Sequence, residues 1–231
     1  MTFQIQKFHF NADPILDHLP QKDQDLIKSE MVRKEEKKDK IIFKEGTRSR
    51  GLYILKKGRV KIYQINKDGK EQIVHIYRKG EMMGYRPLLC NEPHPVFAKT
   101  LEDCTINFIA SDVFLMVLNQ SPVLAQGLLV NLSHEFNVWV NKISIFSQQP
   151  VLERVALSLL ILNETYKSTS RPRLHSVIDL SREDLANYIG TTIETLVRML
   201  RFLKDKKIIQ AHGRKITVLK TNELEKLAAF Y

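Results

Sequence analysis

The chain has 231 residues, 43% of them hydrophobic, so it is long enough to bury a core and to hold two domains. Its two cysteines cannot form a four-thiolate iron–sulfur cluster, its first residues lack the apolar core of a signal peptide, and no run approaches the roughly 20 apolar residues of a membrane span. We therefore expect a cytoplasmic protein without a metal or other cofactor. The net charge of +10 suits a polyanion or an anionic membrane surface and does not choose between them.

The first half of the chain reads as short strands separated by glycine turns. The β-rich runs begin near Ile41 and end near Ile109, and the turn sequence KDGK lies between two of them. Runs of this length with turn residues between them predict an all-β sandwich or barrel. A barrel of this size can enclose one ligand.

A basic region overlaps the start of these strands. From Lys28 to Lys61 there are thirteen lysines and arginines against five acids. Composition leaves the role of this region open, and a solvated charged face is the simplest interpretation.

A long helix is predicted after the strands. It carries an apolar stripe whose members recur at alternating spacings of three and four, namely Leu129, Leu132, Phe136, Trp139, Ile143 and Phe146. Such an a/d stripe either packs within its own domain or pairs with a second copy. We expect a homodimer, because the barrel is too small to bury the whole stripe. Ser147 to Gln149 then predict a hinge, and Pro150 suits the first position of a new helix.

The C-terminal third has the order of a winged helix-turn-helix. A polar loop, KSTSRPRLHS, precedes a short helix in LSREDLANYIG, a longer basic helix in TTIETLVRMLRFLKDKK, and two β-rich runs around HGRK. The apolar faces of the two helices are formed by Leu185, Ala186 and Ile189 and by Leu196, Met199, Leu200 and Leu203. Capping-box spacing, Ser181 to Asp184 and Thr191 to Glu194, predicts where each helix begins.

Glu194 and Arg198 can be explained in two ways. On spacing alone, Glu194 is the N3 residue of a capping box and Arg198 its ion-pair partner one turn later. The surroundings favour base reading, because nine bases against five acids lie between Ser176 and Lys220. A carboxylate close to phosphates is costly unless it accepts a hydrogen bond from a base, as it can from cytosine N4.

These motifs resemble a known family. The stretch from LSREDLANYIG to RKITVL looks like the DNA-binding motif of the cyclic-AMP receptor and FNR family of bacterial transcription regulators, and FKEGTRSRGLYILKKGRVKIY and RKGEMMG look like its barrel. The resemblance covers about residues 15 to 225. It implies an α+β chain with a cyclic-nucleotide-binding-like sensor barrel, a jelly roll, over residues 1–120. A dimerisation helix and hinge over residues 121–149 and a winged helix-turn-helix over residues 150–231 would follow.

The resemblance also implies DNA contacts. Glu194 and Arg198 match the family's glutamate and arginine, which read a G·C-containing half-site core through cytosine N4 and through guanine O6 and N7. The other expected contacts to bases or backbone are Arg182, Thr191, Thr192, Ile193, Arg201, His212 and Lys215. Ile193 replaces a further recognition arginine of the cyclic-AMP receptor, and it can touch a thymine methyl group. We therefore expect a half-site that resembles TTGA.

The same resemblance predicts that the barrel does not bind cyclic AMP. Tyr85 stands where the receptor has a ribose-binding glutamate, His94 and Pro95 replace its phosphate-binding pair, and Trp139 and Val140 replace its adenine-contacting pair. Arg86 either holds a different anion or forms a salt bridge beneath the barrel. The pocket for any other small-molecule effector would include Gly84, Tyr85, Arg86, Leu88 and Trp139.

These predictions combine into one expected function and two rivals. We expect a homodimeric, sequence-specific transcription regulator that binds double-stranded DNA at an inverted repeat and contacts RNA polymerase if it activates. Its barrel would bind an unidentified small molecule or none. The first rival is a ligand-sensing module that regulates a partner protein through a degenerate helix-turn-helix. An enzyme has least support, since the chain has no GxSxG, P-loop, HExxH or Rossmann pattern.

Overall fold

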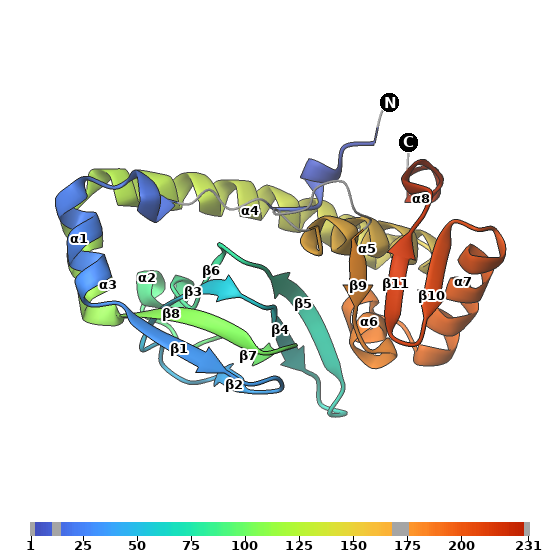
Figure 1. Cartoon of the computed structure of the whole chain (residues 1–231), viewed down its shortest axis with the longest axis horizontal. Coiled ribbons are helices and arrows are strands. Elements are labelled where there is room, and N and C mark those ends of the chain that lie inside the picture. The colour runs from blue at the N-terminus through green and yellow to red at the C-terminus, as the bar shows by residue number, and fades with distance from the viewer. Residues whose placement is uncertain (1–2, 11–14, 168–175, 229–231) are drawn as a thin grey trace. The chain divides into compact units, whose positions relative to one another are not determined.

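The computed structural model describes residues 3–10, 15–167 and 176–228 (Figure 1). The chain divides into two compact units. One unit contains Asn11–Asn66 and Val74–Glu135, and the other contains Met1–Phe10, Lys67–Ile73 and Phe136–Tyr231. The first is built around a β-sandwich, and the second combines helices with a small sheet.

The sandwich is a jelly roll of two four-stranded sheets with strand orders β1-β8-β3-β6 and β2-β7-β4-β5. The strands are β1 (Val32–Glu36), β2 (Ile41–Phe43), β3 (Gly51–Lys57), β4 (Val60–Ile65), β5 (Glu71–Tyr77), β6 (Met82–Met83), β7 (Phe97–Thr100) and β8 (Cys104–Ala110). The predicted strands are thus confirmed, and β1 and β6 are additional. The sequence does not predict β1, because four of its five residues are charged, or β6, because it has only two residues.

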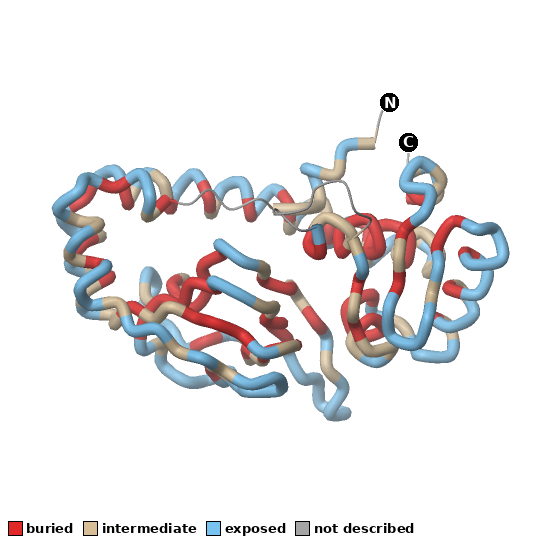
Figure 2. Tube along the Cα trace, viewed as in Figure 1, coloured by how far each residue is buried: buried red, intermediate tan, exposed pale blue. Residues whose placement is uncertain are grey.

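The side chains that point between the sheets form an apolar core. Leu55, Met83 and Ile106 are each at most 1% exposed and belong to one apolar cluster. Figure 2 shows this burial as red segments along the strands. Burying a side chain of this size contributes about 1.5–3 kcal/mol each, so the core holds the two sheets in a fixed arrangement.

A second cluster joins β3 to the helices of the same unit. These helices are η2 (Ile15–His18), α1 (Gln21–Ser29), α2 (Arg86–Cys90), α3 (Ser111–Gln120) and the first part of α4 (Pro122–Gln148), whereas the short η1 (Ile5–Lys7) belongs to the other unit. Phe114 and Leu124 are fully buried in this cluster. Gly127 lets η2 approach α4, because a Cβ atom there would lie 2.8 Å from Cγ2 of Ile15.

The predicted long helix is confirmed as α4. On its apolar stripe, Leu129, Phe136 and Ile143 are 65%, 67% and 64% exposed, while Leu132, Trp139 and Phe146 are half-buried. Packing within one chain therefore leaves half of this stripe open to solvent. Among the described helices, none is singly long and apolar enough to cross a membrane, and only α3 and α4 taken together, as a pair bent by 104°, meet that description.

The predicted hinge is too long. Ser147 and Gln148 still belong to α4, where the Ser147 hydroxyl donates to the carbonyl of Ile143 at 2.7 Å. Only Gln149 and Pro150 separate α4 from α5 (Val151–Thr165). Pro150 is the N-cap of α5 rather than its first residue, and its missing N–H leaves the helix unharmed because N–H groups at a helix start have no intrahelical acceptor.

The predicted helix-turn-helix and hairpin wing are confirmed. The elements are β9 (Val177–Asp179), α6 (Arg182–Ile189), α7 (Ile193–Asp205), β10 (Ile209–His212), β11 (Lys215–Val218) and α8 (Thr221–Ala228), with sheet order β10-β11-β9. The strand β9 and the helix α8, which packs on α5, were not expected, although Leu224 and Ala228 give α8 an apolar face. Of the predicted polar loop, residues 168–175 lie outside the described residues.

Candidate nucleic-acid interface

A capped helix and a glycine turn fix the geometry of the helix-turn-helix. The hydroxyl oxygen of Ser181 accepts from the backbone N–H of Asp184 at 2.9 Å, as the first capping box predicts. At the other end of α6, Gly190 is left-handed with φ +72°, a conformation that favours glycine. The N–H groups of Gly190 and Thr191 both donate to the carbonyl of Ala186, at 2.9 and 3.1 Å. This closure sets the direction in which α7 starts.

The predicted capping box of α7 is wrong by one residue. Thr192, rather than Thr191, is the N-cap, and its hydroxyl oxygen accepts from the N–H of Thr195 at 3.3 Å. Thr191 is already engaged in closing α6, so the helix begins one position later. Glu194 therefore stands at the second helical position, and capping does not explain its side chain.

The helix α7 has one buried face and one free face. Leu196, Leu200 and Leu203 are at most 5% exposed, and Met199 is half-buried beside them. The exposed residues of α7 and its N-cap are Thr192, Ile193, Glu194, Val197, Arg198, Arg201, Phe202, Lys204 and Asp205. The buried leucines hold the helix in place, so the exposed face is presented at a fixed angle, as a recognition helix requires.

Glu194 and Arg198 do not pair with each other. Across the described ranges, neither side chain makes a hydrogen bond or an ion pair, and both are exposed. The described part of the chain therefore contains neither the ion pair nor the capping contact that would explain Glu194 without DNA. The two charges stand one turn apart near the N-terminus of α7, where helix-turn-helix proteins place the side chains that reach base edges.

A side-chain hydrogen bond from Arg182 connects α6 to the wing. Arg182 donates through Nη2 to the carbonyl of Gly213, at the tip of the hairpin, at 2.6 Å. His212 and Lys215 face each other across that hairpin, and both are exposed. The sequence predicted Arg182 as a DNA contact, which stays a prediction, and in the structure its side chain is hydrogen-bonded to the wing.

In the sandwich unit, a partly buried ion pair lies where the sequence placed the effector pocket. Arg86 on α2 pairs with Glu135 on α4, and its Nη1 donates to the hydroxyl of Tyr77 at 3.1 Å. Burial works against the positive charge, but Tyr77, Tyr85 and the Glu135 carboxylate together hold the pKa of Arg86 above its ordinary value. Of the two alternatives for Arg86, the structure shows the salt bridge. Sequence reasoning did not find its partner, although Glu135 is the only acid between Pro122 and Gln148.

The other predicted pocket residues are divided between the units. Tyr85 is 3% exposed, burial raises its pKa, and it packs in one apolar cluster with Leu88. Gly84 has φ +82°, and a Cβ atom there would lie 2.9 Å from Cδ2 of Tyr53. Trp139 belongs to the other unit, where Nζ of Lys142 lies 5.3 Å from its ring centroid. Four of the five residues therefore belong to the sandwich unit and the fifth to the other unit.

Comparison with known proteins follows the two-unit organisation. A cyclic nucleotide-binding domain model matches residues 33–121, and a Crp-like helix-turn-helix domain model matches residues 153–227. The fumarate and nitrate reduction regulatory protein of Vibrio cholerae is 28% identical over 210 residues, which cover 91% of this chain and 82% of the relative. The anaerobic regulatory protein of Aggregatibacter actinomycetemcomitans is 28% identical over 191 residues, covering 83% and 74%.

The chain belongs to the Crp/Fnr family. Solved structures with the same fold include FixK2 from Bradyrhizobium japonicum, with a TM-score of 0.77 and 22% identity over 87% of this chain and 98% of that one. A Crp/Fnr regulator from Eubacterium rectale gives a TM-score of 0.74 at 20% identity, covering 94% and 99%. This chain is a DNA-binding transcription regulator of the Crp/Fnr type, and the relatives named here are regulators rather than enzymes.

Proposed function

We propose that this Crp/Fnr regulator works as a homodimer that recognises an inverted-repeat operator with α7. The observation that carries the proposal is the pair of charges on that helix. Glu194 and Arg198 are exposed and have no partner among the described residues, while Leu196 and Leu200 on the opposite face are buried. Charged groups held in a fixed direction and left unpaired suit a partner with complementary hydrogen-bonding groups.

Several exposed side chains of α7 and of the wing have specific roles in this proposal. Arg198 donates to O6 and N7 of guanine, and Glu194 accepts from N4 of the cytosine in the same region of the half-site. Ile193, which is 43% exposed, contacts a thymine methyl group. Thr192, Arg201, His212 and Lys215 contact phosphates, which fix the register without reading sequence. The resulting half-site resembles TTGA.

The dimer forms through α4 in this proposal. Leu129, Phe136 and Ile143 give each chain an exposed apolar stripe on a 27-residue helix, and pairing two such stripes in register is the arrangement of a short coiled coil. Two recognition helices in a twofold dimer reach successive major grooves, about 34–36 Å apart. Contact with RNA polymerase belongs to the proposal only if the protein activates transcription.

We further infer that cyclic AMP is not the effector. An arginine that binds a cyclic phosphate has to offer its guanidinium to the ligand, whereas Arg86 already donates to Glu135 and Tyr77. A nucleotide phosphate at this place would have to displace a buried carboxylate and would meet its negative charge. DNA binding without cyclic AMP is therefore expected.

In vitro selection from a random duplex library, with no ligand added, tests the proposal. Enrichment of a symmetric TTGA-like repeat is expected. On the selected operator, Arg198→Ala should lose about 1–3 kcal/mol of binding free energy and relax the preference at one G·C pair. Lys206→Ala is the matched control, because Lys206 caps the C-terminal end of α7 and should weaken binding equally for all sequences, if at all.

A second experiment addresses Ile193. Replacing the contacted thymine by deoxyuridine removes only the methyl group, so wild-type affinity should fall and that of Ile193→Ala should stay the same. Enrichment of a guanine at this position would contradict the TTGA half-site. If no sequence is enriched from the library, with or without cell extract, the helix-turn-helix is degenerate and the ligand-sensing alternative is correct.

A further inference from the structure

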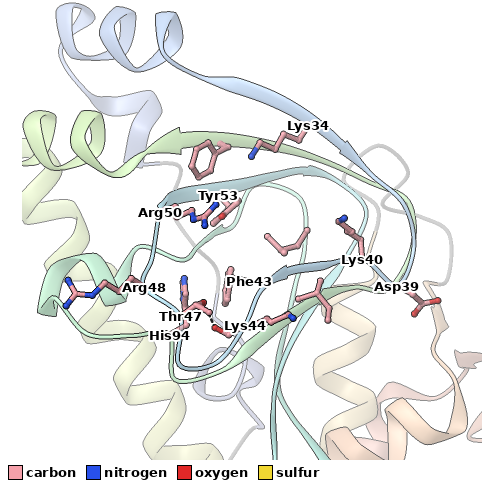
Figure 3. Close-up of a pocket in the computed structure, with 13 residues that line it drawn as sticks. Lys34, Asp39, Lys40, Phe43, Lys44, Thr47, Arg48, Arg50, Tyr53 and His94 are labelled. Carbon is pink, nitrogen blue, oxygen red and sulfur yellow. Dashed lines mark hydrogen bonds between the residues drawn. The ribbon is translucent and has the colours of Figure 1, made fainter.

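The basic region of the sequence surrounds a hollow in the sandwich. The hollow has a volume of about 800 Å³ and is lined by residues of β1, β2, β3, β8 and the neighbouring loops (Figure 3). This volume lies in the range of small-molecule sites, which is roughly 300–1,000 Å³. The hollow's lining shares no residue with the Arg86–Glu135 pair or with the predicted effector pocket.

Aromatic rings line the hollow's wall. The ring of Tyr53 lies 5.9 Å from that of Phe43 and 5.0 Å from that of Phe108, measured between centroids. His94 stacks on Phe43 at 3.9 Å, and burial lowers its pKa, which keeps the ring neutral near pH 7. The Tyr53 hydroxyl makes no hydrogen bond within the described part of the chain, although the residue lines the hollow. The wall thus offers ring faces and one free hydroxyl group.

Positive charges surround these rings. The basic residues that line the hollow are Lys34, Lys40, Lys44, Arg48 and Arg50, against one acid, Asp39. Asp39 is shared with bases outside the hollow, since it lies 3.6 Å from Lys99 and 3.9 Å from Lys38. Nζ of Lys34 lies 4.2 Å from the centroid of Phe108.

The charges on the rim are not neutralised by the protein itself. Lys40, Lys44, Arg48 and Arg50 are exposed, and none of them forms an ion pair with a residue that the structure describes. In Figure 3, Lys34, Lys40 and Arg50 stand around the opening, whereas Arg48 extends away from it. Unpaired like charges held around one concavity repel each other, and a bound anion relieves that repulsion.

We propose that this hollow binds a small planar aromatic molecule that carries two or more negative charges. The ring would lie against Tyr53 and Phe108, and the anionic groups would meet Arg50, Lys40 and Lys34 at the rim. Aromatic faces bind flat rings through stacking, and guanidinium and ammonium groups bind phosphate, sulfate or carboxylate through charge-assisted hydrogen bonds. A concave site with an aromatic wall fits a small molecule better than an acidic protein segment, which needs only the rim.

The test is a titration of the full-length protein with pyranine, a planar trisulfonated pyrene dye, followed by fluorescence anisotropy and by calorimetry for the stoichiometry. One site per chain is expected. Lys40→Ala/Arg50→Ala should weaken dye binding by at least about tenfold, because two of the charged contacts are lost. The control is Lys22→Ala/Lys56→Ala, which removes the same charge from exposed positions outside the hollow and should change affinity less than about twofold.

Two competitors separate the proposal from its alternatives. Citrate, a tricarboxylate without a ring, should bind at least about tenfold more weakly than pyranine, since it gains nothing from the rings. Equal affinities for citrate and pyranine, or equal losses in the two double variants, would overturn the proposal in favour of unspecific charge attraction. Poly-L-glutamate is the second competitor. If it displaces pyranine and binds to the protein more tightly than pyranine, the rim is a docking surface for an acidic protein and the proposal is wrong. Binding of the protein to the selected operator is measured separately, and its outcome does not depend on the dye titration.

Discussion

Replacing Phe136 with alanine should weaken self-association of the protein. Phe136 is 67% exposed in the single chain and stands in the middle of the α4 stripe. Burying a phenylalanine completely contributes roughly 1.5–3 kcal/mol, so covering two-thirds of it contributes about 1.5 kcal/mol per chain. Two copies in a dimer give about 3 kcal/mol, which corresponds to an increase of roughly 150-fold in the dimer dissociation constant.

Sedimentation equilibrium over a concentration series around the wild-type dissociation constant measures this change directly. Val130→Ala is the matched control. Val130 is also an exposed apolar residue of α4, 43% exposed, but it lies six positions before Phe136 and so roughly 120° around the helix. Its loss should change the dissociation constant less than about threefold.

The same variants link assembly to DNA binding. Phe136→Ala should bind a full inverted repeat much more weakly than wild type at equal concentration, while its weak affinity for a single half-site stays unchanged. A wild-type protein that is monomeric at concentrations where it binds the operator would refute the reasoning, as would equal losses in the Phe136 and Val130 variants.

Two further predictions concern the stability of the sandwich unit. Glu135→Ala should lower the free energy of unfolding by about 2–3 kcal/mol, because it leaves the partly buried charge of Arg86 without its partner. Urea denaturation measures this loss. The double variant Arg86→Met/Glu135→Leu removes both charges and should recover most of the stability, and a double variant as unstable as Glu135→Ala would contradict this explanation. Burial lowers the pKa of His94, so the unfolded chain binds the proton first as the pH falls, and stability should decrease as the pH is lowered through and below about 6.5. Thermal melts of wild type and His94→Asn at about pH 7.5 and 5.5 measure this, and an equal loss in both proteins would assign it to other groups.

Two kinds of sequence pattern predicted most of the fold. The strands were recognised as β-rich runs between turn residues, and β3 and β4 are buried over five and four consecutive residues rather than alternately. The stripe of α4 follows spacings of three and four, which the structure confirms as one long helix. The strand β1 was not predicted, because it is a largely exposed, charged strand that is stabilised by backbone pairing with β8. Such a strand has too few apolar residues to be recognised as a β-rich run.

The start of α7 shows the limit of local motifs. The sequence offers two adjacent threonines, and capping-box spacing selects Thr191 because Glu194 follows three residues later. The structure selects Thr192, since the N–H of Thr191 is needed to close the preceding helix on Ala186. A choice between neighbouring caps therefore depends on the turn before them as well as on the helix that they begin.

The two charge features of the sandwich needed three-dimensional information. Arg86 and Glu135 are 49 positions apart and meet only because α2 and α4 pack together. The bases from Lys34 to Arg50 that line the hollow are spread over β1 and the two loops on either side of β2, and their gathering around one hollow follows from the jelly-roll topology. Composition identified the excess charge in this region but gave no sign of the rings beneath it.

The apolar stripe of α4 is shared between the two units. Leu129 and Leu132 belong to the sandwich unit, whereas Phe136, Ile143 and Phe146 belong to the unit that carries the recognition helix, and a single unbroken helix joins them. If two chains assemble along this stripe, neither unit can change its partner alone. Subunits then exchange only as whole chains. A mixed dimer that contains one inactive chain therefore has one recognition helix that binds its half-site and one that does not. A defective chain would in this way weaken operator binding by every mixed dimer that contains it.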